Sequence, residues 1–527
     1  MCRRQHGVHA VCDFLTVILF AIFATELLRR AQKSKAATLG NWGKMEFQVL
    51  SHACLLVRTA SSSLVIDPWL LGSCYWRSWW HFPEAQFDEV QVRAVDAVVI
   101  SHVHWDHWHG ATLKKLFPGK PIYIADEPGL RSERDLKSIG FTDIHRVSHG
   151  KTVCVGDIKI TLYQFGLHIN DAAIVVEANG VCLLNANDAK IAGWPLRHLL
   201  SRHGAIDFAF RSHSSANALA CFQVEDGSSL EPNIDDRYFR SFCAFMDQVR
   251  PRFAVPFASN HCHLHPDSYS FNSSISNPLQ LRAFVQRSEA SKRDWSLQVM
   301  LPGSIWVQND GFKLASEHCF EDIQSELIRR SAQISEKLST NADYESRVVV
   351  DKRIFERFGR LLRSLNLKSH FEGYVFITIN WPDGHGLTRV FNLQTGESTE
   401  APYTKRSVPG IPLAIFPAVV FRDSVIKNMF HHACISKRCR FTARSDSDMS
   451  KLRALIVRLE LVELGRYPFQ WQYFRRFVAA YLRRWRELFV YAHALWLTRF
   501  LRVSIYHVEE AVIRGQLTVR NIETPGN

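Results

Sequence analysis

Short apolar runs separated by turn residues follow one another from Met45 onward. Residues 47–50, 54–57 and 63–66 are apolar or alternating runs that end in polar or turn residues, as expected of meandering strands. The series continues with strands expected at 95–100, 121–124, 158–163, 173–177 and 181–184, and with short helices at 111–116 and 195–201. This order favours an α/β fold in which helices sandwich two sheets, although periodicity alone does not separate it from other α/β folds.

The pattern changes after about Ser316. Residues 323–338 carry apolar side chains at helical spacing among charges, which predicts an amphipathic linker helix. Strand-like runs at 371–380, 387–392 and 411–416 predict a smaller α/β accessory domain. Between 470 and 502, apolar residues recur at steps of three and four with arginines between them, which predicts a basic amphipathic helix. We interpret this helix as docked on the accessory domain, with an anionic membrane surface as the alternative partner.

These patterns divide the chain into five parts. They are an apolar and basic extension (1–44), an α/β catalytic domain (45–315), a linker helix (316–345), a small α/β accessory domain (346–450) and a basic helical tail (451–527). The apolar run of the extension, residues 14–24, is shorter than the roughly 20 residues that a membrane span needs. We interpret the extension as a weak membrane-surface anchor or an over-extended start before Met45, with a signal peptide as the alternative.

Composition and charge narrow the classes of protein. The chain has 527 residues, 46% of them hydrophobic, and a mean hydropathy of -0.11, which excludes a disordered chain and a polytopic membrane protein. Its twelve cysteines are scattered singly, which favours reduced thiols and a cytoplasmic location. The net charge of +13 favours anionic partners, namely an anionic metabolite or an anionic membrane surface. Nucleic acid is not expected, because no recognised binding module is present.

The segment 101–109, Ser-His-Val-His-Trp-Asp-His-Trp-His, directly follows an expected strand. Its side chains therefore lie on a loop at the carboxyl end of that strand. Packing three imidazoles and a carboxylate at one point is costly unless a cation binds them. His102 and His104 can reach one ion from alternate positions, and Asp106 with His107 can reach a second ion nearby. This spacing predicts a dinuclear metal site.

Further ligands are expected just past later strands. His168 follows the 158–163 run, and Asp188 follows the 181–184 run. A cluster of histidines, His261, His263 and His265, follows the apolar segment 253–257. A lone His or Asp in a loop is usually a capping or surface residue, but the order His, Asp, His behind the loop motif favours a role in metal binding.

The sequence His-x-His-x-Asp-His with a later His, Asp and His resembles the metallo-β-lactamase fold superfamily. The resemblance implies an αββα sandwich with a dinuclear metal site. Carried over by position, it implies ligands of a first metal (His102, His104, His168), ligands of a second metal (Asp106, His107, His265) and a bridging carboxylate (Asp188), with His261 as the alternative late ligand. Asp106 and Asp188 are the expected catalytic residues.

A second element resembles one branch of that superfamily more closely. Asp67-Pro-Trp-Leu-Leu-Gly and the pair Trp79-Trp80 are similar to the metallo-β-lactamase-like domain of CMP-N-acetylneuraminate hydroxylases, over roughly residues 46–310. The resemblance implies that Asp67 orients a metal-bound histidine and that His52 lies near the active site. Trp79 and Trp80 are expected either in the core or along a substrate pocket.

The expected activity follows from the metal. Zinc, iron and manganese all suit ligands of this kind. Two irons would favour an oxygenase or hydroxylase acting on an anionic metabolite, whereas two zincs would favour a hydrolase of a phosphodiester, lactone or amide. The hydroxylases also carry a Rieske domain. Cys262-x-x-His265 is present here but no Cys-x-His is, so an oxygenase would need a separate electron donor. A non-catalytic, membrane-associated adaptor is the third hypothesis.

The sequence contains no complete nucleotide-binding loop and no serine-nucleophile motif. Gly150-Lys151-Thr152 lacks the glycine-rich loop of a nucleotide-binding motif, since the position five before the Gly is His145. The chain also has no Gly-x-Ser-x-Gly turn for a serine nucleophile. The metal site is therefore the single catalytic signal in the sequence.

Overall fold

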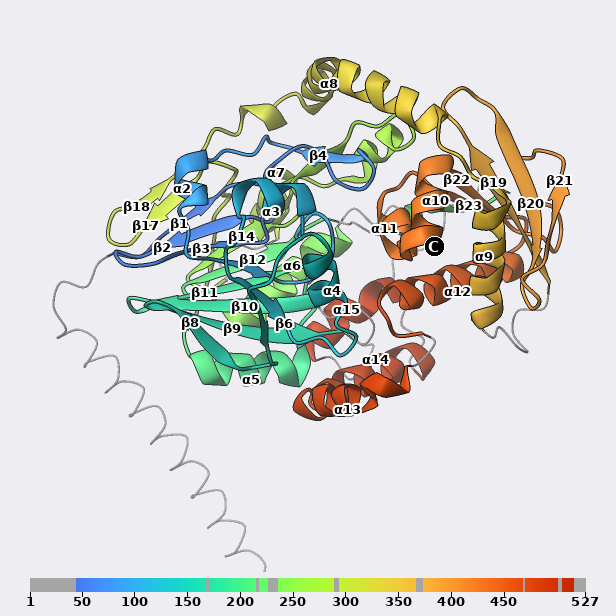
Figure 1. Ribbon diagram of the computed structural model, residues 1–527. Coiled ribbons are helices and arrows are strands. Elements are labelled where there is room, and N and C mark those ends of the chain that lie inside the picture. The colour runs from blue at the N-terminus through green and yellow to red at the C-terminus, as the bar shows by residue number, and fades with distance from the viewer. Residues whose placement is uncertain are drawn as a thin grey trace, which may run out of the picture. The chain divides into compact units, whose positions relative to one another are not determined.

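A computed structural model describes eight stretches of the chain (Figure 1). They are residues 44–166, 171–214, 218–225, 236–288, 293–365, 373–467, 470–500 and 505–515. Met45–Asn527 forms one compact unit. The expected extension (1–44) lies outside the described residues, except for Lys44.

The first sheet has eight strands in the order β18-β17-β1-β2-β3-β5-β6-β7. Their bounds are β1 (Glu46–Val49), β2 (Leu55–Arg58), β3 (Ser63–Ile66), β5 (Ala97–Ile100), β6 (Ile122–Ala125), β7 (Ile144–Val147), β17 (Ile305–Val307) and β18 (Gly311–Lys313). β3, β5, β6 and β7 run parallel. All four residues of β5 are buried, as expected of a parallel strand that is covered on both faces.

The second sheet has seven strands in the order β16-β14-β12-β11-β10-β9-β8. Their bounds are β8 (Thr152–Val155), β9 (Ile158–Phe165), β10 (Asp171–Ala178), β11 (Val181–Asn187), β12 (Phe208–Ser212), β14 (Phe253–Phe257) and β16 (Ser296–Leu297). Asn179 and Gly180 connect β10 to β11 with positive φ angles of 50° and 80°. A two-residue hairpin turn favours this conformation because its twist matches that of the strands.

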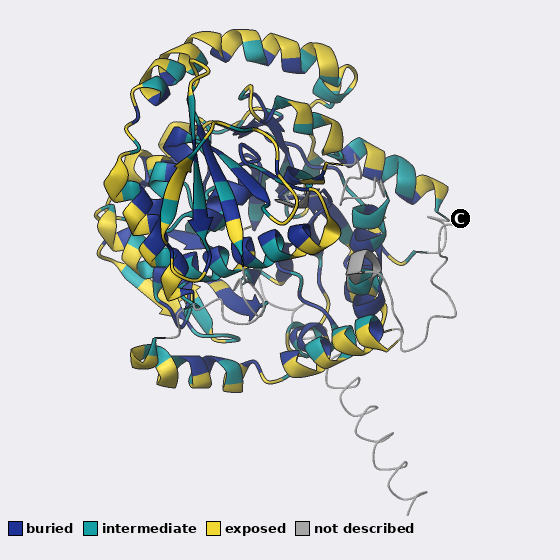
Figure 2. Cartoon of the chain, turned by 90° about the vertical axis from the view of Figure 1, so that its right-hand side faces the viewer, coloured by how far each residue is buried: buried dark blue, intermediate teal, exposed yellow. Residues whose placement is uncertain are grey.

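Helices cover the outer face of each sheet. α2 (Glu89–Arg93), α3 (Gly110–Leu116) and α4 (Arg131–Ser138) flank the first sheet, and α5 (Gly193–His203), α6 (Arg237–Val249) and α7 (Pro278–Arg287) flank the second. A core that includes Phe47, Ile160 and Phe210 fills the space between the sheets. Figure 2 shows buried and exposed residues alternating along the helices. The expected αββα sandwich is confirmed.

A third, six-stranded sheet lies in the C-terminal half, in the order β13-β23-β22-β19-β20-β21. Its strands are β13 (Phe222–Val224), β19 (Tyr374–Asn380), β20 (Gly386–Asn392), β21 (Ser398–Ala401), β22 (Leu413–Pro417) and β23 (Arg440–Ala443). Four helices pack against it: α9 (Lys352–Ser364), α10 (Ala418–Lys427), α11 (Phe430–Ile435) and α12 (Asp446–Glu463). Its edge strand β13 comes from inside the expected catalytic domain. The third sheet is therefore built from both halves of the chain.

The halves are also joined by a long helix, and a small ribbon lies within the first half. α8 (Ile323–Ser346) runs along the upper edge of Figure 1 from the first half to the second. A two-stranded ribbon pairs β4 (Trp79–His81) with β15 (His261–His263). Single 3₁₀ turns lie at Ala218–Cys221, Tyr269–Ser274, His318–Phe320 and Trp471–Tyr473.

The tail is not one continuous helix. Beyond α12, its described residues form three helices, α13 (Phe474–Arg483), α14 (Glu487–Arg499) and α15 (Ile505–Arg514). The break at Arg484 has a physical reason: this residue turns inward, and its guanidinium donates to Glu487 and to the Gly166 carbonyl. No helix among the described residues is long and apolar enough to cross a bilayer.

Candidate metal centre

The ligand loop, residues 101–109, leaves the buried end of β5 and enters α3. His109 is the N-cap of α3, and its side chain accepts from the Thr112 N–H. The four predicted ligands of this loop, His102, His104, Asp106 and His107, are all buried. A loop held at both ends by regular elements keeps these side chains at the edge of the sheet.

Three groups of side chains offer ligand atoms that lie within 4.8 Å of one another. The groups are His52 with Asp106 and His107, His102 with His104 and Asp171, and His102 with His107 and Asp188. Five of the predicted ligands thus converge, while His168 lies outside the described residues. Two of the groups share His102 and two share His107, so the site is extended enough for more than one ion.

Asp188 lies between the two histidines that link these groups. Its Oδ2 is 3.3 Å from His107 Nε2 and 4.0 Å from His102 Nε2. Asp171, at the start of β10, places Oδ1 3.9 Å from His102 Nε2. Asp171 was not predicted, because in the sequence it is a single carboxylate at the edge of a strand.

Asp67 lies beneath the ligand loop and is fully buried at a positive φ of 48°. Its carboxylate accepts from Ser101 N and Oγ, both at 2.7 Å, and from Asn187 Nδ2 at 3.0 Å. His107 Nδ1 lies 2.9 Å from the same carboxylate. These contacts fix the ring of His107 so that its Nε2 faces Asp188.

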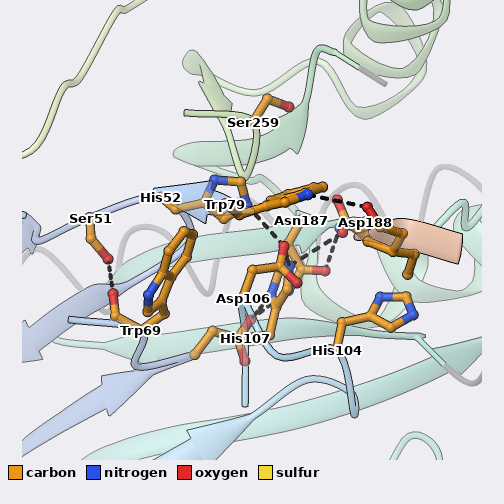
Figure 3. A network of polar contacts seen from close by, with 12 residues as sticks. Ser51, His52, Trp69, Trp79, His104, Asp106, His107, Asn187, Asp188 and Ser259 are labelled. Atoms are coloured by element: carbon orange, nitrogen blue, oxygen red, sulfur yellow. Dashed lines mark hydrogen bonds and ion pairs between the residues drawn. The ribbon is translucent and has the colours of Figure 1, made fainter. Parts of the chain in front are cut away.

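Asp106 is held from the opposite side. His52 Nε2 lies 3.1 Å from its Oδ2, and the Tyr75 hydroxyl donates to its Oδ1 at 2.5 Å. Figure 3 shows Asp106 between His52 and His107, with Asp188 beside Asn187. Tyr75 was not predicted because it lies in an irregular segment, where residues 75–77 all have positive φ.

The protonation preferences of the loop differ from residue to residue. Burial lowers the pKa of His104 well below its usual value, with help from the neighbouring His102 and His431. Burial alone would also lower the pKa of His107, but the Asp106 and Asp67 carboxylates outweigh it and raise that pKa. Burial would raise the pKa of Asp106, but His107 lowers it well below its usual value. Asp106 is therefore an anion, as a metal ligand must be.

The C-terminal half reaches this site through α11. His431 places its Nε2 2.7 Å from His104 Nε2, and its Nδ1 3.4 Å from Glu460. The next residue, His432, contacts Glu463 through Nδ1 and lies 3.2 Å from the Val103 carbonyl through Nε2. Sequence reasoning missed both histidines, since they are more than 300 residues away and carry no motif.

The late histidines occupy different surroundings. His265 lies 3.4 Å from Asp267, and burial, with Arg438 nearby, lowers its pKa to about 4. Like His261, it belongs to none of the three groups above. The His261 ring stacks on Trp79 at 3.6 Å and lies 5.5 Å from the His52 ring. The structure therefore brings His261, and not His265, toward Asp106.

The two tryptophans of the predicted pair also differ. Trp79 is buried and donates to the Ile435 carbonyl of α11 at 3.2 Å. Trp80 packs with Phe82 and with Leu327 of α8. Trp79 therefore lies beside the site, whereas Trp80 packs in the contact with the linker helix.

The donor set fits metal ions. His107 Nε2 and Asp171 Oδ1 are buried, and among the described residues neither makes a hydrogen bond. Buried polar atoms that make no hydrogen bond are rare, and a bound ion would explain both. Imidazole and carboxylate ligands without a thiolate suit zinc, iron and manganese.

Part of this chain is similar in sequence to known proteins. Residues 46–189 match the family model described as the beta-lactamase superfamily domain. Cytidine monophosphate-N-acetylneuraminic acid hydroxylase of Mus musculus is 34% identical over 262 residues, which is 47% of this chain and 45% of that protein. The same enzyme of Cricetulus griseus is 28% identical over 262 residues, 47% of this chain and 46% of that protein. The chain thus spans about half the length of these relatives.

Solved structures with partial likeness include CmlA, a diiron β-hydroxylase from Streptomyces venezuelae. It is 15% identical with a TM-score of 0.34, over 51% of this chain and 54% of that one. Isothiocyanate hydrolase from Delia radicum gut bacteria is 17% identical with a TM-score of 0.36, over 50% of this chain and 98% of that one. At TM-scores this low, neither structure bears on the activity of this chain.

Proposed function

We propose that this chain is a dinuclear metal enzyme that hydroxylates a small anionic molecule with two iron ions. The main support for the proposal is that three clusters of imidazole and carboxylate side chains overlap at one edge of the sheet. The relatives named as hydroxylases support the choice of reaction, since their similarity covers 262 residues, about half of this chain. A hydrolase with two zincs is the second candidate, because zinc accepts the same ligands.

The residues divide into two sets of ligands. His102, His104 and Asp171, with His168 from outside the described residues, would hold the first ion. Asp106, His107 and His52 would hold the second ion, and Asp188 would bridge the two. We assign the late ligand to His261 and not to His265, because both ring nitrogens of His261 are buried and make no hydrogen bond with described residues.

When bound, two irons would supply the activation of dioxygen, and two zincs would supply a Lewis acid for hydrolysis. The protein's own residues would set the geometry. Asp67 accepts from His107 and fixes the tautomer that leaves Nε2 free to coordinate. The Tyr75 hydroxyl donates to one oxygen of Asp106, and the other oxygen, which faces His52, would be the one that coordinates the ion.

A cavity of about 910 Å³ lies against the ligand loop, and we propose that it admits the substrate, although none of the proposed ligands among the described residues lines it. Trp105 and His109 of the loop line it, together with Tyr75. Four cationic side chains, Arg77, Arg131, Arg134 and Lys427, also line it and outnumber its two carboxylates, Asp135 and Asp423. Aromatic faces and cations together suit an anionic molecule. Hydroxylation also consumes electrons, and we propose that a separate protein donates them.

The experiment uses the full chain loaded with iron, a chemical reductant, dioxygen and cytidine monophosphate-N-acetylneuraminic acid. We expect a product heavier by the mass of one oxygen atom, formed by wild type but not by Asp106→Ala. Cleavage of the substrate by the zinc-loaded chain, with no oxygenated product from the iron-loaded chain, would favour the hydrolase. If neither the iron-loaded nor the zinc-loaded chain converts the substrate, both activities toward this substrate are contradicted. That result would favour the non-catalytic adaptor.

A further inference from the structure

The tail helices carry an unusual number of exposed apolar side chains. On α13 they are Phe474, Val478 and Leu482, and on α14 they are Leu488, Phe489, Leu495 and Trp496, with Trp471, Trp485 and Phe500 at the helix ends. The exposed fraction reaches 67% for Leu482, 61% for Leu488 and 65% for Leu495. We call this set the tail face. Single exposed apolar residues are ordinary, but ten large ones within 30 residues of chain mark an interaction surface.

The opposite side of the same helices is docked on the catalytic domain. Phe477, Ala480, Val490 and Leu497 are buried, and Val490 and Leu497 belong to the core that covers the second sheet. Trp194 of α5 packs against Trp485 and Phe489 at ring distances of 4.8 and 4.9 Å. Trp485 and Phe489, which are 39% and 55% exposed, therefore lie at the border between the docked side and the tail face. The other residues of the tail face lie away from the docked side of α13 and α14, which are at the lower edge of Figure 1.

The charge of the segment identifies the kind of partner. Residues 470–500 contain six arginines and a single acidic residue, Glu487. Glu487 is buried and paired with Arg484, so it presents no negative charge to a partner. Arg475 and Arg499 are exposed beside the apolar side chains, and Arg483, which is also exposed, donates to Ser148 and lies 3.7 Å from Asp126. Amphipathic helices with tryptophan, phenylalanine and leucine on one side and arginine at its border bind the surface of anionic membranes.

We propose that the tail face binds the surface of an anionic phospholipid bilayer. α13 and α14 lie in the headgroup region, with their apolar side chains inserted and with Arg475 and Arg499 near lipid phosphates. Helices of 10 and 13 residues are too short to span the bilayer, so the contact is peripheral. The proposal is independent of the reaction that the metal centre performs.

The experiment is co-sedimentation of the full chain with vesicles of phosphatidylcholine alone or with phosphatidylserine added. We expect binding to the vesicles that contain phosphatidylserine, at least about tenfold weaker binding to the neutral vesicles, and weakening by salt. The variant Leu482→Ser/Leu488→Ser/Leu495→Ser should lose at least about tenfold in affinity. Arg475→Gln/Arg499→Gln should lose about fivefold per arginine on the anionic vesicles.

The controls change similar residues elsewhere. Val90→Ser/Ile328→Ser/Val349→Ser replaces exposed aliphatic residues away from the tail, and Arg353→Gln/Arg360→Gln replaces exposed arginines of α9. Both should bind like wild type. Equal loss in the controls, or unchanged binding of the leucine variant, would overturn the proposal. Light scattering tests the alternative that the tail face binds a second copy of the chain. If wild type does not bind vesicles but forms a dimer, and only the leucine variant is monomeric, the tail face is a dimer interface instead.

Discussion

The ligand loop and helix α11 both reach the metal centre, but they are held in place in different ways. The loop follows a buried strand, and a single buried carboxylate, Asp67, anchors it from within the same domain. α11 comes from the C-terminal half and reaches His104 with His431, supported by Glu460 and Glu463 of α12. We therefore propose that the loop supplies ligands and that α11 orients them. A site of this kind depends on both halves of the chain even when one half contains the motif.

The largest effect is expected from breaking the ligand loop itself. His102→Ala removes an imidazole that belongs to two of the three ligand groups. We expect metal affinity to fall by at least about 100-fold, the upper end of what loss of a supporting residue costs. Competition with a chelator followed by metal analysis measures it. His318→Ala, at an exposed position, is the matched control, and equal metal content in both variants would contradict the assignment.

The next effect concerns the contact between the halves. Arg438 is buried and donates to Glu345 of α8 at 2.7 and 2.9 Å, to Asp267 at 2.9 Å and to the Trp76 carbonyl at 2.9 Å. Glu345→Gln leaves this guanidinium partly unpaired, and we expect the free energy of unfolding to fall by about 3–5 kcal/mol. Urea denaturation measures it, and Glu321→Gln at an exposed position is the control. A loss equal to that of the control would show that the pair does not join the halves.

Acid offers a second readout of the same pair. Burial would raise the pKa of Glu345, but hydrogen bonds and charge from Arg438 outweigh it and hold that pKa below its ordinary value of 4.5. The stabilisation is therefore complete above about pH 4.5 and is lost as the pH falls through the lower pKa of the folded state. The difference in free energy of unfolding between wild type and Glu345→Gln should therefore become smaller as the pH falls below about 4.5. A difference that stays constant down to acid pH would contradict this origin.

Removing the anchor of the loop should cost less than removing a ligand. Asp67→Asn keeps the size of the side chain but removes the charge that faces His107 Nδ1. We expect metal affinity to fall by about 10–100-fold while the fold persists. Metal titration with circular dichroism as a check measures it. Asp143→Asn, at an exposed position, should leave metal affinity unchanged. If Asp67→Asn has the same metal affinity as this control, Asp67 does not position the metal-binding histidine.

The smallest effect is expected from α11. His431→Phe keeps a ring beside His104 but removes the hydrogen bond, and we expect metal affinity to fall by about tenfold. His431→Gln, which can still form a hydrogen bond, should restore part of the loss. His385→Phe is the exposed control. Equal affinities for all variants would show that the C-terminal half only packs against the site and does not orient it.

The sequence predicted what is local. The order of strands and the crowded histidines at 102–107 needed only neighbouring residues, because such crowding is costly without a cation. The C-terminal half was predicted less well. Strand β13 joins the third sheet from inside the first half, and His431 meets His104 across 327 positions. Neither contact leaves a periodic or motif signal. The tail was predicted as a single helix, and the break at Arg484 depends on partners elsewhere in the chain.

The most direct test of the account is the identity and number of metal ions in the full chain. It combines metal analysis with a Mössbauer spectrum of protein purified from cells that are supplied with both iron and zinc. We predict about two irons per chain with the spectrum of a coupled pair, both lost in Asp106→Ala. About two zincs would contradict the hydroxylase and favour the hydrolase, and a chain without metal would contradict the metal centre itself.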